Sequence, residues 1–314
     1  MKHSSILVFI TALLLTYCTD ELRSQQYLNF PIDTVVSDEF YNYRAYLNYD
    51  NAGKIHLVNS RQFHTNSATR EIFYWNNVSG SMIPYRVTNN STDDNYVTIG
   101  FDDVGKVHLG WERRDAANLF QLIYTNNRNV SAGFGDSVWI TSGGLNKATP
   151  YMAVGKNDSS VHFVYFTFVT GQDNAFYRKY NYVTGALGNE LTLGPAEASG
   201  ENDISIAVDS FGKLHIVYTT NHSSGTGTLK YFNNEAGNIT ELQTGVSDLV
   251  SYPSITIDNG NVLHIVYRRS GRQQALYYQQ TFRRNFSTPL QLLRQLDSLL
   301  ITGLSTLIMK EDSM

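Results

Sequence analysis

The chain of 314 residues carries a formal net charge of −4, with 42% hydrophobic and 17% charged residues. This charge balance argues against a nucleic-acid partner, because such proteins concentrate Lys and Arg in a basic patch. The apolar content is sufficient for a buried core and excludes a wholly disordered chain. Tyr, Val, Ile and Thr recur in short runs, which favours strands over helices.

Residues 1–24 are predicted to be a signal peptide. Lys2 and His3 precede an apolar run over 6–15, and polar sequence resumes at Thr19. About ten apolar residues are too few to span a bilayer but fit the core of an export signal. A buried strand or helix is the alternative reading. Export would place the protein in the periplasm, on the outer surface or outside the cell, with no transmembrane segment in the mature chain.

The single cysteine, Cys18, lies at the end of this segment. The residues before it loosely resemble a lipoprotein cleavage box, although Tyr17 stands where a small residue is expected. Lipid attachment at Cys18 and ordinary cleavage nearby both stay open. In either case the mature domain has no disulfide.

Five histidines recur along the chain at intervals of 52, 54, 53 and 49 residues: His56, His108, His162, His215 and His264. In four of the five units an aspartate stands six residues earlier: Asp50, Asp102, Asp209 and Asp258. Each begins an Asp-x-x-Gly sequence, or Asp-x-x-Asn in the last unit. This pattern predicts a hairpin turn, in which Asp bonds the backbone and Gly or Asn accepts a positive φ.

Each unit contains four short β runs in order. A first run precedes the turn, and the histidine run forms the second strand. The third is marked by the runs 72–75, 121–124, 175–177, 229–232 and 275–278, and a weaker fourth by 137–140 and 239–242. Four strands in about fifty residues are typical of one propeller blade. The sequence therefore predicts an all-β protein, a β-propeller of four-stranded antiparallel blades with five complete repeats. A β-sandwich would not return the same residue types at a fixed period.

The predicted propeller domain spans residues 25–289. Residues 27–36 are a candidate outer strand that pairs with the last blade. Residues 290–314 are either a tail or an incomplete sixth blade of a truncated chain, because 303–309 align with the first strand of a unit. Five and six blades both stay open.

Over about residues 40–280 the unit resembles the repeats of exported bacterial β-propellers in the broad sialidase-like class. The resemblance implies the fold and says little about activity. The Asp-box of true sialidases, Ser-x-Asp-x-Gly-x-Thr-Trp, is absent. The catalytic residues of that family therefore cannot be assigned to positions here.

The histidines invite a metal hypothesis, which the repeat itself disfavours. Each occupies the same position in a different blade, whereas zinc ligands lie about 2 Å from one ion. We expect each imidazole to hydrogen-bond the backbone and so join the turn to the strand. We expect the turn aspartates to cap the backbone of their turns and not to bind calcium. No cofactor motif is present, and no cofactor or metal is expected.

A candidate ligand face follows each histidine. Aromatic residues stand three positions after it at Trp111, Tyr165, Tyr218 and Tyr267, and arginines stand five positions after it at Arg61, Arg113 and Arg269, flanked by Arg114 and Arg268. The two-residue period of a strand places both sets on one side. Arginine suits carboxylate or sulfate groups, and aromatic rings stack on sugars. The alternative is that the aromatics form inter-blade core and the arginines are solvated.

Catalytic pairs were sought among the loop carboxylates Asp93, Asp94, Glu201 and Asp203. Nothing in the sequence shows that two of them converge, as glycoside cleavage would require. No catalytic residue is assigned. The sequence favours a non-catalytic exported module that binds a glycan or a cell-surface protein through the propeller loop face. The alternatives are a glycosidase or polysaccharide lyase using that face, and a structural blade array in a larger secreted protein.

Overall fold

The computed structural model describes residues 41–62, 69–168, 173–196, 204–220, 228–244, 246, 250–269, 275–282, 285–286 and 290–294. They belong to a unit that spans Phe40–Met314. All regular elements in these ranges are β-strands. None of the described residues forms a helix with the length and apolar character to cross a membrane.

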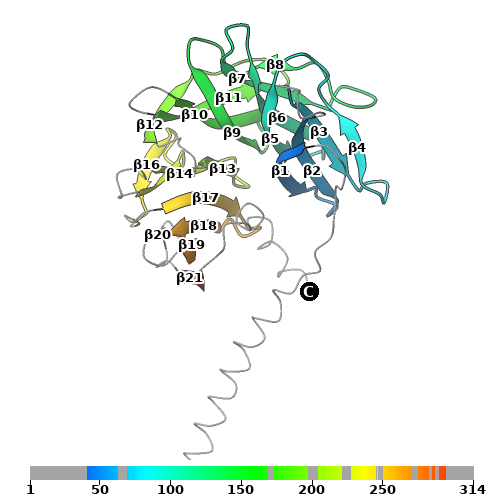
Figure 1. Cartoon of the computed structure of the whole chain (residues 1–314). Helices are drawn as coiled ribbons and strands as arrows, with labels where there is room; N and C mark the ends of the chain where they lie inside the picture. Colours follow the sequence, from blue (N-terminus) through cyan, green and yellow to red (C-terminus); the bar gives the residue numbers. More distant parts are fainter. Residues whose placement is uncertain are drawn as a thin grey trace, which may run out of the picture. The chain divides into compact units, whose positions relative to one another are not determined.

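The strands form five antiparallel sheets (Figure 1). The first contains β1 (Tyr41–Tyr49), β2 (Ile55–Gln62), β3 (Glu71–Asn76) and β4 (Ile83–Arg86), and the second β5 (Asp94–Phe101), β6 (Val107–Arg114), β7 (Phe120–Asn126) and β8 (Val138–Trp139). The third contains β9 (Asn146–Val154), β10 (Ser160–Phe168), β11 (Asp173–Asn181) and β12 (Leu191–Ala196), and the fourth β13 (Ile204–Val208), β14 (Leu214–Thr220), β15 (Thr228–Asn233) and β16 (Thr240–Gln243). The fifth contains β17 (Val250–Ile257), β18 (Leu263–Arg269), β19 (Ala275–Phe282), β20 (Asn285–Phe286) and β21 (Leu290–Arg294). The predicted four-strand repeat is confirmed.

Successive sheets pack in chain order through their first strands. β1 contacts β5, β5 contacts β9, β9 contacts β13, and β13 contacts β17. An apolar cluster lies at each of these four junctions, and each contains one of the four aromatic residues that follow a histidine by three positions. The core is therefore divided among the sheet interfaces.

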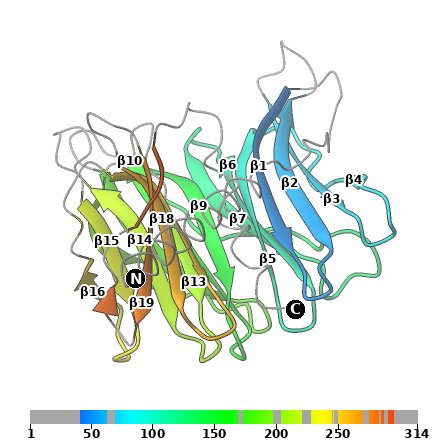
Figure 2. The ribbon, with the colours of Figure 1, turned by 90° about the horizontal axis from the view of Figure 1, so that it is seen from below.

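The two ends of the sheets differ. The turn end carries the hairpin between the first and second strands, as seen for β1 and β2 in Figure 2. The loop end carries the connections between second and third strands and between successive sheets. Turn ends of neighbouring sheets touch: Asn157 donates its N–H to Asp103 (3.2 Å), and Ser210 donates its N–H to Asn261 (2.9 Å).

The predicted Asp-capped hairpins occur at the turn end. Asp102 Oδ1 accepts the N–H groups of Val104 (3.1 Å) and Lys106 (2.8 Å), and Gly105 has φ 76°. The Asp50, Asp209 and Asp258 turns show the same pair of bonds. Asn261 takes the glycine position with φ 59°.

The histidines bond side chains, and our expectation of backbone partners was wrong. Nδ1 lies 2.6–2.8 Å from a third-strand tyrosine hydroxyl in four sheets, pairing His56 with Tyr74, His108 with Tyr124, His162 with Tyr177 and His215 with Tyr231. Nε2 lies 3.0–3.7 Å from a turn carboxylate in all five sheets. Hairpin and third strand are thus joined through the imidazole.

Burial lowers the pKa of His56, His162 and His215, and that of His108 to about 4, although the neighbouring carboxylate raises it. The neutral ring then directs its Nε2–H toward Asp and accepts the tyrosine proton at Nδ1. Burial likewise raises the pKa of Tyr74 and Tyr231 to about 12, which keeps both hydroxyls as donors.

The third sheet departs from the pattern. Lys156 stands six residues before His162, and Asp158 supplies the carboxylate instead, 3.7 Å from Nε2. Ser159 adopts the positive φ there, at 53°.

The expected boundary between propeller and tail falls inside the fifth sheet, because β21 pairs with β19. Residues 1–40 and 295–314, with the candidate outer strand at 27–36 and the sixth-unit alignment at 303–309, lie outside the described residues.

Candidate functional site

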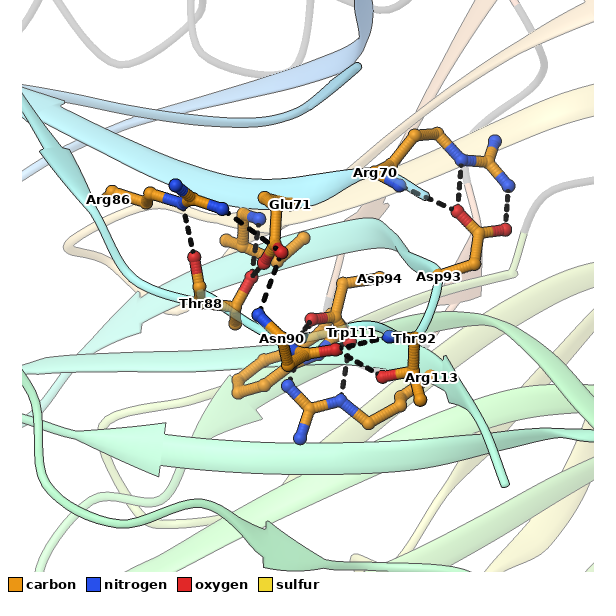
Figure 3. A network of polar contacts seen from close by, with 11 residues as sticks. Arg70, Glu71, Arg86, Thr88, Asn90, Thr92, Asp93, Asp94, Trp111 and Arg113 are labelled. Carbon is orange, nitrogen blue, oxygen red and sulfur yellow. Dashed lines mark hydrogen bonds and ion pairs between the residues drawn. The ribbon is translucent and has the colours of Figure 1, made fainter. Parts of the chain in front are cut away.

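The connection between the first and second sheets is fixed by a buried glutamate. Glu71, at the start of β3, is 2% exposed. It accepts the Thr88 hydroxyl, the N–H of Asn90 (2.9 Å) and Arg86 Nη2 (3.2 Å), as Figure 3 shows. The segment leading into β5 is thereby held against the loop end of the first sheet.

Asp93 joins the two sheets through an arginine fork. Arg70 donates its backbone N–H (3.1 Å) and Nε (2.7 Å) to Oδ1, and its Nη2 to Oδ2 (Figure 3). Arg114 Nε lies 3.9 Å from the same carboxylate. Bidentate pairs of this kind fix geometry as well as charge.

Asp94 is fully buried and accepts four hydrogen bonds. Trp111 Nε1 lies 2.9 Å from Oδ1, and Arg113 donates Nε (2.6 Å) and Nη2 (2.9 Å). Asn90 Nδ2 completes the set at 2.8 Å (Figure 3). Two of the four loop carboxylates considered for catalysis, Asp93 and Asp94, are therefore each engaged by arginine.

Glu112 is the titratable group that the sequence reasoning missed. It is 1% exposed and accepts the N–H of Thr149 from the third sheet (3.1 Å). Burial raises its pKa to about 7; the Thr149 bond and the charges of Arg70 and Arg44 oppose the shift, and Asp93 adds to it. A carboxyl that titrates near neutrality can act as an acid or base where a substrate reaches it.

These groups form a charged set that we call the loop-end cluster: Arg44, Arg70, Asp93, Asp94, Glu112, Arg113 and Arg114. The set contains four arginines, two aspartates and one glutamate, and the pKa of that glutamate is about 7. The balance favours an anionic ligand.

Exposed aromatic surface accompanies the cluster. Tyr43 is 37% exposed, donates its hydroxyl to Gln62 (2.9 Å), and lies with its ring centroid 5.4 Å from the Arg70 guanidinium carbon. The Arg44 guanidinium carbon lies 4.3 Å from the ring centroid of Tyr96. No sequence pattern predicts the contact of Arg44 with Tyr96, because these residues lie in the first strands of two different repeats.

The aromatic residues predicted to face a ligand lie in the core. Trp111, Tyr165, Tyr218 and Tyr267 are each at most 1% exposed. The Tyr165 hydroxyl donates to Glu190 (2.5 Å), which also accepts Lys147 Nζ (2.9 Å). The alternative reading, inter-blade core, describes their position.

The predicted arginines are not gathered at one point. Arg113 and Arg114 lie in the loop-end cluster. Arg61 is 5% exposed, its guanidinium carbon 4.6 Å from the Phe73 ring centroid. Arg268 donates Nε to the Ser251 hydroxyl (2.9 Å), and Arg269 is half-buried at the end of β18.

Two of the loop carboxylates, Glu201 and Asp203, fall outside the described residues. Among the residues that the structure does describe, no three His, Cys, Asp or Glu side chains come together as a metal site.

No protein-family profile and no curated protein sequence matches this chain. Solved structures do resemble its fold. An ulvan lyase, described as a new family of polysaccharide lyase, aligns with a TM-score of 0.54 and 12% identity over 85% of this chain and 72% of its own. A protein of unknown function from Dyadobacter fermentans gives a TM-score of 0.59 and 9% identity over 82% and 84%. The NanB sialidase of Streptococcus pneumoniae gives 0.53 and 9% over 84% and 64%.

These likenesses show the fold alone. The chain is a β-propeller, as the repeat predicted, and it shares this fold with enzymes that act on glycans.

Proposed function

We propose that this protein is an exported, non-catalytic module that binds an acidic glycan through the loop end of its propeller. The observation that carries the proposal is that the loop-end cluster holds four arginines but only two aspartates and Glu112, whose pKa is about 7, beside the exposed ring of Tyr43. Guanidinium groups suit carboxylates and sulfates, and tyrosine rings suit sugar faces.

The fold supports a glycan partner. One resembling structure is the ulvan lyase bound to a saccharide of glucuronate and sulfated rhamnose, and others are sialidases. Binding without catalysis is supported by the engagement of Asp93 and Asp94, since each already accepts an arginine fork. The apolar segment at 6–15 supports the export part of the proposal.

A carbohydrate-active enzyme, a glycosidase or polysaccharide lyase, is the second candidate. Glu112 favours it, because a carboxyl with a pKa of about 7 suits proton transfer near neutral pH. Its exposure of 1% disfavours it, because a catalytic acid must reach its substrate.

A glycan array followed by titration tests the first proposal. Binding to acidic glycans over neutral ones is expected. Arg114→Glu at the loop end should weaken it by about tenfold or more through charge reversal. Lys156→Glu is the matched control, because both side chains are partly exposed (37% and 40%) and near an aspartate, but Lys156 lies at the turn end.

Absence of glycan binding, or equal loss in both variants, contradicts the proposal. A reducing-end assay and an assay for unsaturated uronate products, both on acidic polysaccharides, test the second candidate. Turnover that disappears in Glu112→Gln would establish an enzyme in place of a binder.

A further inference from the structure

A β-bulge recurs in the first strand of four sheets, close to the loop end. The pairing register shifts at this point in β1, β5, β9 and β17. One non-glycine residue in each bulge has a positive φ: Arg44 (29°), Tyr96 (50°), Thr149 (50°) and Tyr252 (51°). Such residues are uncommon, and they concentrate at binding and catalytic sites.

In β5 and β17 the bulge turns its side chain out of the buried strand. Tyr96 is half-buried, although Asn95 and Val97 on either side are only 4% and 5% exposed. Tyr252 is likewise half-buried next to fully buried Ser251. Bulges are known to re-aim a side chain beside a site. Here they carry one residue per sheet toward solvent at the loop end.

The bulge residues of the first three sheets are physically linked. Arg44 of β1 lies over the ring of Tyr96 of β5, 4.3 Å from its centroid. The N–H of Thr149 in β9 donates to Glu112, and Glu112 pairs in register with Asn95, the neighbour of Tyr96. Since β1 packs on β5 and β5 on β9, these residues occupy the same bulge position on three adjoining first strands, and we call the three of them the row.

We propose that this row, Arg44, Tyr96 and Thr149, is the contact line for an acidic oligosaccharide. Arg44 binds the carboxylate or sulfate of one sugar, Tyr96 presents its ring and hydroxyl to the next, and the Thr149 hydroxyl oxygen accepts a hydrogen bond from a sugar hydroxyl. The proposal rests on the glycan-binding function proposed above. It assigns that function to residues which neither the repeat pattern nor the histidine spacing marks.

The backbone feature repeats while the side chain differs, and this contrast separates a binding role from a purely structural one. A bulge needed only for packing would favour glycine or asparagine at the positive φ. Arg, Tyr and Thr instead occupy it, and Thr is β-branched, which makes its conformation a genuine outlier. A rigid scaffold that displays varied side chains is the usual arrangement of a recognition surface.

Titration with chondroitin sulfate, hyaluronan and neutral dextran tests the row. Arg44→Ala and Tyr96→Ala should each weaken binding of the acidic polymers by about tenfold or more, as loss of a central arginine or tyrosine contact does. Tyr49→Ala and Lys156→Ala are the matched controls, exposed at the turn end, and should leave affinity unchanged. Arg44→Ala should also reduce the preference for acidic polymers over dextran.

A pair of substitutions at one position separates recognition from folding. Tyr96→Gly and Tyr96→Ala both delete the ring, but glycine relieves the positive φ. We expect the Gly variant to have the higher Tm of the two and the same weakened affinity. Affinity that recovers together with Tm would show that Tyr96 acts through stability and would overturn the proposal.

The remaining outcomes are equally decisive. If the unmodified protein binds acidic polymers and the row variants bind as tightly, the row is wrong and the glycan-binding function stands. If the unmodified protein binds none of the polymers and no glycan on the array, both are wrong.

Discussion

The turn end and the loop end of the sheets are built on opposite plans. At the turn end the same three groups recur: a turn carboxylate and a histidine in every sheet, and a tyrosine hydroxyl in the four where its contact is described. At the loop end the partners change from sheet to sheet. Asp94 holds Arg113 in the second, Glu190 holds Lys147 in the third, and Ser251 holds Arg268 in the fifth.

This difference shows where each kind of constraint acts. Every sheet must close the same hairpin and join it to its third strand, so the turn end is uniform. The loop end carries connections of unequal length, and we propose that its charges meet the ligand. The residues that repeat in every sheet therefore have a structural role. The candidate site lies where side chains differ between sheets although the backbone is the same.

The largest expected effect is at the loop end, from Asp94→Ala. The change leaves the Arg113 guanidinium, whose side chain is 16% exposed, without its buried partner. Removing one member of a buried pair costs about 3–5 kcal/mol of unfolding free energy. Asp103→Ala, whose side chain is 50% exposed at the turn end, should change it by less than about 1 kcal/mol. Urea unfolding of both variants makes the measurement, and a similar small loss in both would contradict the network.

Acidification should destabilise the turn end next. The unfolded chain binds a proton on His108 below about pH 6.5, whereas the folded chain does so only near 4. Folding stability present above pH 6.5 is therefore lost as the pH falls toward 4. Between pH 7 and 5 this histidine alone accounts for about 2 kcal/mol. Urea unfolding at both pH values measures the loss, and His108→Gln should reduce it. An unchanged pH dependence in that variant would show that folding does not shift the pKa of His108.

Glu112 should show the opposite sign. Its pKa is raised in the fold from 4.5 to about 7, so the folded state holds a proton that the unfolded state has released. The carboxyl therefore costs stability as the pH rises from 4.5 through 7. Glu112→Gln should raise the unfolding free energy by about 2–3 kcal/mol more at pH 8 than at pH 5. Equal effects at the two pH values would indicate that Glu112 is ionised throughout.

The smallest expected effect on stability concerns the turn of the third sheet, where serine and not glycine has the positive φ. Ser159→Gly relieves a positive φ and should stabilise the protein by about 1 kcal/mol. Gly105→Ala introduces the same strain in the second turn, where its Cβ meets no atom within 4 Å, and should destabilise by a similar amount. Thermal unfolding checks both, and shifts of one sign would show that φ is not the controlling quantity.

The sequence by itself determined the repeat, the four strands of each unit, and the Asp-capped hairpins. These are local features: a turn depends on residues two and four positions from its aspartate, and a strand on its own alternation. The sequence also predicted the propeller, because one supersecondary unit recurs at a nearly regular interval along the chain.

Tertiary structure alone decided which groups meet. The partner of His108 is Tyr124 in another strand, and Trp111 faces a core that the first sheet completes. The contact of Arg44 with Tyr96 joins two sheets. It depends on a bulge in each strand, and the spacing of residues in the sequence does not predict these bulges. Position along the chain fixes a side chain's neighbours within a strand, but burial and charge pairing depend on surfaces contributed by distant repeats.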